Sequence, residues 1–374
     1  MKKILAMSVV LLMAVSCGKK TSFPEITHMP FKTESDGKWG LVGTDGKILV
    51  EPTYEFEPSA VVNGVFSVPV KENKDDWYAN RVEYYTASKT PKQIGETYEE
   101  GGYLNCGVIP VVKEDSPVLF IDKNGKEAFE FTEHNGKPVL QVANMFTDNL
   151  CAFYTEAGYG FVNNKGKVVI EPNKEWTSVN PFNEGLAIVV TEKGLTQSID
   201  TKGNVVGKNL GEYGSGVYMD GLFVNDGVVY DRKGEKVFET DKGQLIVSSF
   251  VNGYAVFYKD GCFGVLNKKG EVVVKPKYSR PIGLDSKGVY FAEKDGTVYV
   301  SYKDKVITDF KKDVFPVSAK ALVCRSDKGH RSFVKKDGKD LNKDLYKNIS
   351  LDGLYIDGAR VVVDKDWIYS NKNE

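Results

Sequence analysis

Short apolar runs, separated by turns rich in glycine, asparagine and aspartate, recur along most of the 374-residue chain. A typical run is Leu186–Val190, and a typical separator is Lys259-Asp260-Gly261. Runs of this length that are rich in valine and isoleucine and bounded by turn residues predict β-strands. No window sustains an apolar period of 3.6 residues, so the pattern predicts an all-β protein with almost no helix.

A longer pattern occurs three times, within residues 38–54, 159–172 and 263–278. Each copy has an aromatic residue and glycine, two apolar residues, a turn ending in glycine, a charged residue, three apolar residues, then an acidic or basic residue and proline. The defining residues are Trp39, Gly40 and Pro52 in the first copy, Tyr159, Gly160 and Pro172 in the second, and Phe263, Gly264 and Pro276 in the third. Each copy predicts two strands joined by a tight turn. We expect the proline to end the second strand, because proline has no N–H for the sheet.

The glycine that closes this turn also marks weaker copies between the clear ones. The turn glycines are Gly46, Gly125, Gly166, Gly203, Gly234, Gly270 and Gly338. In the usual form, Asn/Asp-x-x-Gly, the first side chain caps the backbone that follows and the glycine adopts a left-handed conformation. The spacing predicts about ten units of roughly 36 residues, the last of them a partial copy at residues 360–370.

The units are predicted to be tandem antiparallel meanders of three to four strands, and residues 31–374 to form one repeat domain. Two hairpin turns in each unit favour radial blades, as in a β-propeller, over a parallel solenoid with one strand per face. An open, curved array of β-blades, or two smaller rings, is the alternative arrangement.

The aromatic-Gly pair, the glycine turn and the terminal Glu/Lys-Pro together resemble the WG, or KWG, repeat family. Only the first copy keeps the literal tryptophan, at Trp39. The resemblance implies a propeller-type repeat module that binds partners. It supplies no catalytic residues.

The first seventeen residues have the form of an export signal. Lys2 and Lys3 precede an uncharged apolar run, Ile4–Val15, which is shorter than the ~20 residues that a membrane-spanning helix needs. The segment from Ala14 to Cys17 resembles the lipobox of bacterial lipoproteins, although the family usually has leucine at the position of Ala14. The resemblance implies cleavage after residue 16 and a diacylglycerol on Cys17.

Residues 17–30 are predicted to be a lipid-anchored tether, because they contain two prolines and few apolar side chains. The first acidic residue after Cys17 is Glu25. Surface-exported lipoproteins resemble one another in carrying acidic residues directly after the cysteine, so we expect this chain in the cell envelope, on the periplasmic side of the outer membrane.

The charges of the chain nearly balance, with 50 Lys and Arg against 51 Asp and Glu. A near-neutral chain without a basic, aromatic-rich stretch is a poor candidate for nucleic-acid binding, and we predict none. For the same reason, contact with a membrane is expected through the N-terminal lipid only.

A search for catalytic and metal-binding patterns is negative. His28, His134 and His330 lie far apart, and no zinc spacing, nucleophile elbow or phosphate loop occurs. The lysines inside the Asn/Asp-x-x-Gly turns would repel calcium. We therefore predict no catalytic residue, no metal and no cofactor.

The cysteines after Cys17 are isolated in the sequence, without a C-x-x-C pair: Cys106, Cys151, Cys262 and Cys324. This spacing does not support zinc or redox motifs. Cys151 aligns with Ala187 and Ala255 of other units, which predicts a small buried side chain at this position.

The sequence thus favours a non-catalytic envelope lipoprotein that acts as a repeat-based binding or scaffolding module. Envelope proteins or a cell-wall glycan are the expected partners. The alternative is a glycan-binding or glycan-processing protein that uses a propeller face, since sequence cannot show which carboxylates face each other. Aromatic residues in the predicted inter-unit loops could contact a partner or pack between blades: Trp77, Tyr78, Trp176, Tyr213 and Tyr278.

Overall fold

The computed structural model describes residues 26–31, 37–43, 47–113, 118–251, 253–279, 282–284, 289–294, 297–302, 305–310, 314–316, 321–325 and 331–335. The predicted signal peptide, Cys17, Gly46, Gly338 and the partial copy at 360–370 lie outside these ranges. Every regular element in the described ranges is a β-strand, which confirms the all-β prediction. No described helix is long and apolar enough to cross a membrane.

The strands follow one another as antiparallel blades in chain order. Blades 1 and 2 comprise β1 (Ile26–Phe31), β2 (Trp39–Gly43) and β3 (Ile48–Tyr54), then β4 (Val61–Val62), β5 (Val65–Val70), β6 (Arg81–Thr86) and β7 (Gln93–Tyr98). Blade 3 comprises β8 (Glu100–Gly101), β9 (Val108–Val112), β10 (Val118–Asp122) and β11 (Glu127–Glu130), and a separate hairpin, β12 (Glu133–His134) and β13 (Lys137–Pro138), follows it. Blade 4 comprises β14 (Gln141–Val142), β15 (Leu150–Thr155), β16 (Gly158–Asn163) and β17 (Val168–Asn173).

The second half of the chain continues this order. Blade 5 comprises β18 (Trp176–Val179), β19 (Leu186–Thr191), β20 (Thr196–Asp200) and β21 (Val205–Gly207), and blade 6 comprises β22 (Phe223–Asn225), β23 (Val228–Tyr230) and β24 (Lys236–Glu239). Blade 7 comprises β25 (Gln244–Ile246), β26 (Tyr254–Lys259), β27 (Cys262–Asn267) and β28 (Val272–Tyr278). Blade 8 comprises β29 (Gly283–Leu284), β30 (Val289–Lys294), β31 (Thr297–Tyr302) and β32 (Lys305–Phe310), and blade 9 comprises β33 (Val314–Pro316), β34 (Ala321–Arg325) and β35 (Arg331–Lys335).

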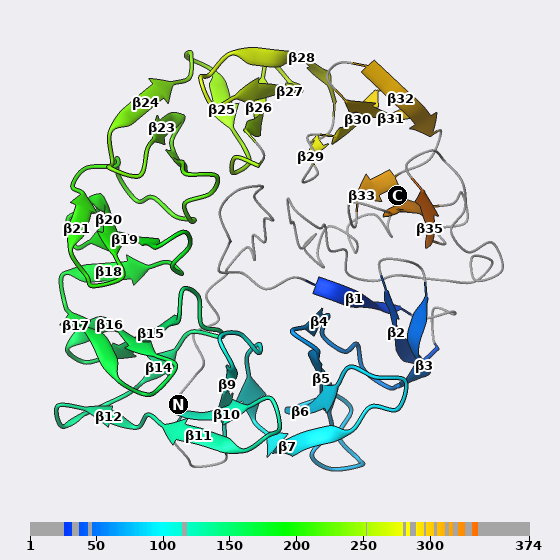
Figure 1. The fold of residues 1–374 in the computed structure, drawn as a ribbon, viewed down its shortest axis with the longest axis vertical. Coiled ribbons are helices and arrows are strands. Elements are labelled where there is room, and N and C mark those ends of the chain that lie inside the picture. The colour runs from blue at the N-terminus through cyan, green and yellow to red at the C-terminus, as the bar shows by residue number, and fades with distance from the viewer. Residues whose placement is uncertain are drawn as a thin grey trace.

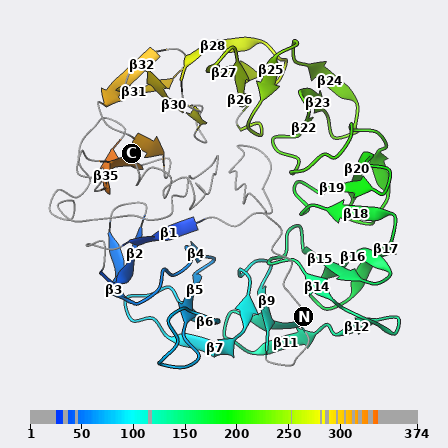
Figure 2. The ribbon, with the colours of Figure 1, turned by 180° about the vertical axis from the view of Figure 1, so that it is seen from behind.

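The blades succeed one another around a common centre, and blade 9 returns beside blade 1 (Figures 1 and 2). The fold is therefore β-propeller-like, with a single ring rather than two. In blade 2, β4 lies near the centre and β7 at the periphery (Figure 1). Blades 1 and 2 share one seven-stranded sheet, because β1 pairs with β4 as well as with β2.

The ring begins earlier than the sequence indicated. Strand β1 starts at Ile26, inside the segment 17–30 that we predicted to be tether, and its residues Met29 and Phe31 are fully buried. The prolines suggested an irregular segment, but Pro30 lies in β1 opposite Leu41 of β2. The free energy gained by burying Met29 and Phe31 exceeds the cost of the one sheet hydrogen bond that Pro30, which has no N–H, cannot donate.

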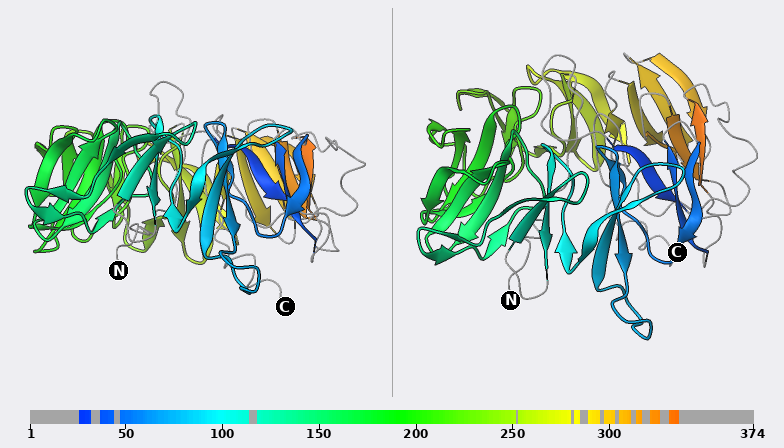
Figure 3. Two further views of the ribbon diagram at one scale, coloured as in Figure 1. Left: turned by 90° about the horizontal axis from the view of Figure 1, so that it is seen from below. Right: turned by 60° about the horizontal axis from the view of Figure 1, so that its bottom comes forward.

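The ring is a flat disc with two distinct faces (Figure 3). We call one the motif-turn face: it carries the Asn/Asp-x-x-Gly turns, such as 163–166 and 267–270. The other, the loop face, carries the hairpins between the second and third strands of a blade, such as 71–80 and 260–261, because successive antiparallel turns alternate between faces. The first residue of β1 lies at the motif-turn face, since His28 pairs with Gly43 at the end of β2.

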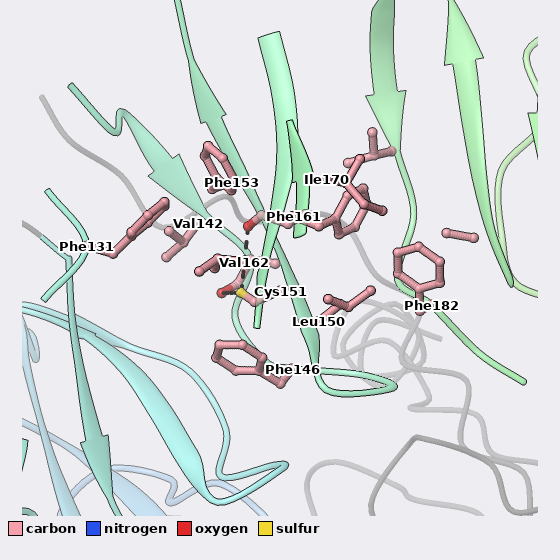
Figure 4. Packing of buried hydrophobic residues seen from close by; sticks show 14 of the residues in the cluster. Phe131, Val142, Phe146, Leu150, Cys151, Phe153, Phe161, Val162, Ile170 and Phe182 are labelled. Atoms are coloured by element: carbon pink, nitrogen blue, oxygen red, sulfur yellow. Dashed lines mark hydrogen bonds between the residues drawn. The ribbon is translucent and has the colours of Figure 1, made fainter. Parts of the chain in front are cut away.

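The hydrophobic core runs between blades as well as within them. Figure 4 shows Phe131, Phe153, Phe161 and Phe182, from blades 3 to 5 and the chain between them, packed around Cys151. The rings of Phe161 and Phe182 meet edge to face, with centroids 4.9 Å apart. The sheets of blades 3 to 5 therefore share one core.

Cys151 fills the small buried position that the repeat alignment predicted. Its side chain is 1% exposed, and Ala187 and Ala255 are fully buried at the equivalent places, which confirms that prediction. Burial raises the pKa of the Cys151 thiol to about 12. The group is a packing element and stays protonated near neutral pH.

The prolines of the repeat do not end their strands, so this expectation was wrong. Strand β17 continues through Pro172, and the register shifts there, so that Glu171 and Pro172 lie opposite the single residue Gly160. A bulge leaves an unpaired position, which proline can occupy without the loss of a sheet hydrogen bond. Pro52 and Pro276 also lie within strands, β3 and β28, where three residues lie opposite Gly40 and Gly264 respectively.

The glycine of the aromatic-Gly pair makes this bulge possible. A β-carbon on Gly160 would lie 2.7 Å from the ring of Phe153 and 2.9 Å from the carbonyl oxygen of Ile170. A β-carbon on Gly264 would meet Phe257 and the carbonyl of Val274 at similar distances. The glycine and the proline bulge therefore occur together, because the absence of a side chain on the glycine leaves room for the bulged strand opposite it.

Candidate functional site

The Asn/Asp-x-x-Gly turns share one hydrogen-bond pattern. In the turn of blade 4, the N–H of Asn163 donates to the carbonyl of Lys167 over 2.8 Å, and the N–H of Gly166 donates to the carbonyl of Asn163. The Asn163 side-chain oxygen accepts the N–H groups of Lys165 and Lys167 over 3.0 Å each. Gly166 has a φ of 78°, the left-handed conformation that glycine adopts without strain.

The turn glycines also touch the preceding blade. A β-carbon on Gly166 would lie 2.9 Å from Phe129 of blade 3, and one on Gly270 would lie 2.8 Å from Phe238 of blade 6. The same relation holds for Gly125 against Gly95, Gly203 against Ile170 and Gly234 against Gly207. Each glycine therefore serves both its turn and the contact between blades, and the second role was not visible in the sequence.

Two linked carboxylates join blades 5, 6 and 7 on the motif-turn face. Glu184 of blade 5 accepts the backbone N–H groups of Asp220 and Gly221, each over 2.9 Å. Its carboxylate lies 3.4 Å from the guanidinium of Arg232 in blade 6, and its side chain is only 2% exposed. Asp220 in turn pairs with Lys268 of blade 7 over 2.8 Å.

The donors in these contacts occupy one equivalent position. Arg232 and Lys268 are each the second residue of an Asn/Asp-x-x-Gly turn, and each also donates to a backbone carbonyl of the preceding blade. Asn164 holds the same place in blade 4 and donates to the carbonyl of Cys106 over 2.8 Å. These polar groups are thus engaged in holding blades together.

The loop face instead presents aromatic side chains to solvent. Trp77 is 88% exposed and Tyr78 54%, and their rings meet at 88° with centroids 5.6 Å apart. Tyr213 of the same face is 75% exposed. In contrast, Trp176 and Tyr278 are buried. Only three of the five aromatic residues singled out in the sequence are therefore available for contact.

The segment that carries Trp77 is braced at its base. The N–H of Glu72 donates to the side-chain oxygen of Asn80 over 2.9 Å, and the N–H of Asn73 donates to the carboxylate of Asp76 over 3.0 Å. Arg81 pairs with Glu72 over 2.5 Å. The loop is therefore a fixed platform under the two rings.

A shallow depression of about 570 Å³ lies on the loop face of blade 4, lined by Ala157 and residues 171–175. At its side, Nε2 of His134 lies 2.7 Å from the carboxylate of Glu171. This contact ties the hairpin β12–β13 to β17. No third titratable group joins the pair to form a metal site among the residues that the structure describes.

The other histidines and cysteines are dispersed. His28 lies on β1 beside Thr27, and His330 is outside the described ranges. Cys106, Cys151 and Cys262 are free thiols. Cys324 lies on β34, where the structure describes only the strand.

Comparison with known sequences identifies the repeat. Three segments, residues 39–56, 159–193 and 263–297, match the family described as "WG containing repeat". They begin at Trp39, Tyr159 and Phe263, the aromatic residues of the three clear copies. No curated protein sequence matches the chain.

Several solved structures resemble the fold at very low identity. A eukaryotic initiation factor is 10% identical, with a TM-score of 0.52 over 84% of this chain and 95% of that one. BamB from Moraxella catarrhalis is 12% identical, with a TM-score of 0.41 over 79% of this chain and 94% of that one. The computationally designed protein Ika8 is 12% identical, with a TM-score of 0.42 over 86% and 98%. The initiation factor shares the fold alone. The described blades and the matched segments together show a β-propeller-like ring in which three segments match the WG-type repeat.

Proposed function

We propose that the protein is a non-catalytic lipoprotein of the bacterial cell envelope whose ring binds or scaffolds a partner through its loop face. The observation that carries the proposal is the exposure of Trp77, Tyr78 and Tyr213 on one face. Water-exposed large aromatic side chains are costly to hold there, and they are enriched where proteins contact partners.

The position of the first strand supports an orientation for this face. Ile26 begins β1 at the motif-turn face, nine residues after Cys17. Nine extended residues span at most about 30 Å. A lipid on Cys17 would therefore hold the motif-turn face toward the membrane, with the loop face turned to the envelope space.

The anchor is tested by labelling cells with a palmitate analogue. The wild type should be labelled, and Cys17→Ser should give an unlabelled precursor or a freely soluble product. Equal labelling of both proteins would contradict the lipoprotein proposal. Protease should leave the protein intact in whole cells and cleave it after permeabilisation, whereas cleavage in whole cells would place it on the surface.

The binding face is tested by pull-down from envelope extract with the lipid-free mature protein. We expect the triple variant Trp77→Ala, Tyr78→Ala and Tyr213→Ala to lose the specific ligand that the wild type captures. The control alters exposed lysines of the motif-turn face, Lys165→Ala and Lys233→Ala, and should retain it. Loss in the control but not in the loop-face variant would show that the other face binds.

A further inference from the structure

We propose that the loop at residues 71–80 of blade 2 is a binding site for a neutral glycan, with the indole of Trp77 as the stacking surface for a pyranose ring. This inference rests on the proposed binding function and names its ligand class. The argument uses the geometry of the two rings, the bracing of the loop and the charges around it.

The aromatic pair has the form of a carbohydrate platform. Trp77 is 88% exposed although Tyr78 touches it edge to face, so a full indole face remains open. The faces of aromatic rings are electron-rich and attract polarised hydrogens. One face of a pyranose presents several C–H groups of this kind over an area close to that of an indole.

The loop also supplies groups for the hydroxyls of a sugar. Lys74 and Asp75 precede the aromatic pair, separated from it by Asp76, and both are exposed. Neither has a hydrogen bond or ion pair in the part of the chain that the structure describes. The side-chain amide of Asn73 is exposed as well. Together they provide donors and acceptors beside the stacking surface, which fixes the orientation of a polar ligand.

The platform is held in place before any ligand arrives. Asn80 accepts the N–H of Glu72 and donates to the carboxylates of Glu72 and Asp76. Arg81 completes the base through its ion pair with Glu72. A braced loop loses little conformational entropy on binding, which favours a small ligand with a limited contact area.

The local charge favours a neutral ligand. Residues 71–81 contain three basic side chains (Lys71, Lys74 and Arg81) and three acidic ones (Glu72, Asp75 and Asp76). Such a balanced segment gives no net attraction to an anionic membrane or a polyanion.

The shape of the surroundings favours a sugar over a protein partner. The loop projects from the disc (Figure 3), and the residues before the aromatic pair are charged or polar. A stable protein interface buries about 800 Å² on each side around its aromatic anchors. Two rings at the tip of a polar loop offer far less apolar area than that.

The test uses the lipid-free mature protein with chitotetraose, an uncharged N-acetylglucosamine oligomer, and with purified peptidoglycan sacculi, whose glycan strands are uncharged although their peptides carry charge. Trp39 and Trp176 are buried, and Trp367 lies outside the described ranges, so the fluorescence is measured in a Trp367→Phe background, in which the exposed Trp77 should dominate quenching by acrylamide. Chitotetraose should protect the fluorescence from acrylamide and shift it to the blue. Trp77→Ala should bind sacculi at least 10-fold more weakly, Trp77→Phe should keep part of the affinity, and Lys165→Ala, an exposed position of the motif-turn face, should bind like the wild type.

Four outcomes would overturn the inference. If sacculi bind Trp77→Ala and wild type equally, the glycan site is elsewhere, while the proposed binding function stands. If neither glycan binds but pull-down partners are lost with Trp77→Ala, the loop is a protein-docking site. If vesicles of neutral phosphatidylcholine, and not the glycans, cause the blue shift, the loop contacts lipid. If neither the glycans nor the vesicles bind, and the triple loop-face variant captures the same partners as the wild type in the pull-down, the proposed binding function of the loop face is wrong as well.

Discussion

On one face of the ring the connections between strands contact the preceding blade, whereas on the other face they vary in length. On the motif-turn face, turns of nearly constant length place a glycine and a polar side chain against the preceding blade, as Gly270 and Lys268 do. On the loop face, the connections range from the two residues Asp260–Gly261 to the ten residues 71–80. The repeat therefore preserves the residues that join blades and leaves the opposite face free to vary.

The largest loss of stability is expected when the buried carboxylate of the motif-turn face, Glu184, is removed. Glu184→Ala should lower the free energy of unfolding by about 3 kcal/mol, because it removes the carboxylate that pairs with Arg232 and leaves two backbone N–H groups without their acceptor. Denaturant melting measures this loss. Glu184→Gln keeps one acceptor oxygen and should lose about half as much.

The matched control is an ion pair at the loop face, Glu55 with Lys71, in which the glutamate is 64% exposed. Glu55→Ala should cost below about 1 kcal/mol, as exposed pairs do. Equal losses for Glu55→Ala and Glu184→Ala would show that the two faces do not differ in this respect.

Two glycines of blade 7 compare the faces at the same backbone conformation. Gly270 and Gly261 have φ values of 81° and 82°, but only a β-carbon on Gly270 would meet a neighbour, the ring of Phe238. Gly261→Ala should cost about 1 kcal/mol for the left-handed conformation. Gly270→Ala should cost about 2 kcal/mol more through overpacking between blades. Thermal or denaturant melting of the pair isolates the contact, and similar losses would argue against it.

The capping aspartates should make the motif-turn face sensitive to acid. Burial raises the pKa of Asp200, but hydrogen bonds from Asn204 and from the N–H of Lys202 lower it by more, so the net pKa lies below its ordinary value of 3.8. A lowered folded-state pKa stabilises the protein above that ordinary value, and this contribution is lost as the pH falls through the folded-state pKa.

Asp200→Asn tests this dependence, since asparagine holds the same position at Asn163 and Asn267. The variant should melt close to the wild type at pH 7 and lose less stability than the wild type at pH 3. The reverse change, Asn163→Asp, should add acid sensitivity. Parallel pH profiles for all three proteins would contradict the prediction.

The smallest effect is expected at the exposed tryptophan. Trp77→Ala should change the free energy of unfolding by less than about 0.5 kcal/mol, because the side chain is 88% exposed and meets the ring of Tyr78 edge to face. Melting of this variant also validates its use in binding tests. A large loss would assign Trp77 to the fold rather than to a ligand.

The turns could be predicted from sequence because their chemistry is local. An asparagine or aspartate that caps the next residues and a glycine with positive φ need only four consecutive residues. The partner of each glycine on the preceding blade, such as Phe129 for Gly166, depends on the angle between blades. No sequence spacing encodes that angle directly.

The aromatic residues show the same limit. Trp77 and Trp176 both follow polar loop residues, yet one is exposed and the other is buried in β18. The useful signal was the context: five of the six residues before Trp77 are charged, whereas Trp176 is followed within three residues by Val179. The proline bulge was missed because it requires Gly160 on the neighbouring strand, which only the register reveals.

The double pairing of β1 has a mechanical consequence. A pull on the chain ahead of Ile26 acts along the axis of a strand that is bonded on one edge to β2 and on the other to β4. Tension in that direction must shear hydrogen bonds on both edges together instead of peeling them one at a time. The force is therefore shared between two blades, and the first strand of the ring resists being pulled out by tension on the N-terminal chain.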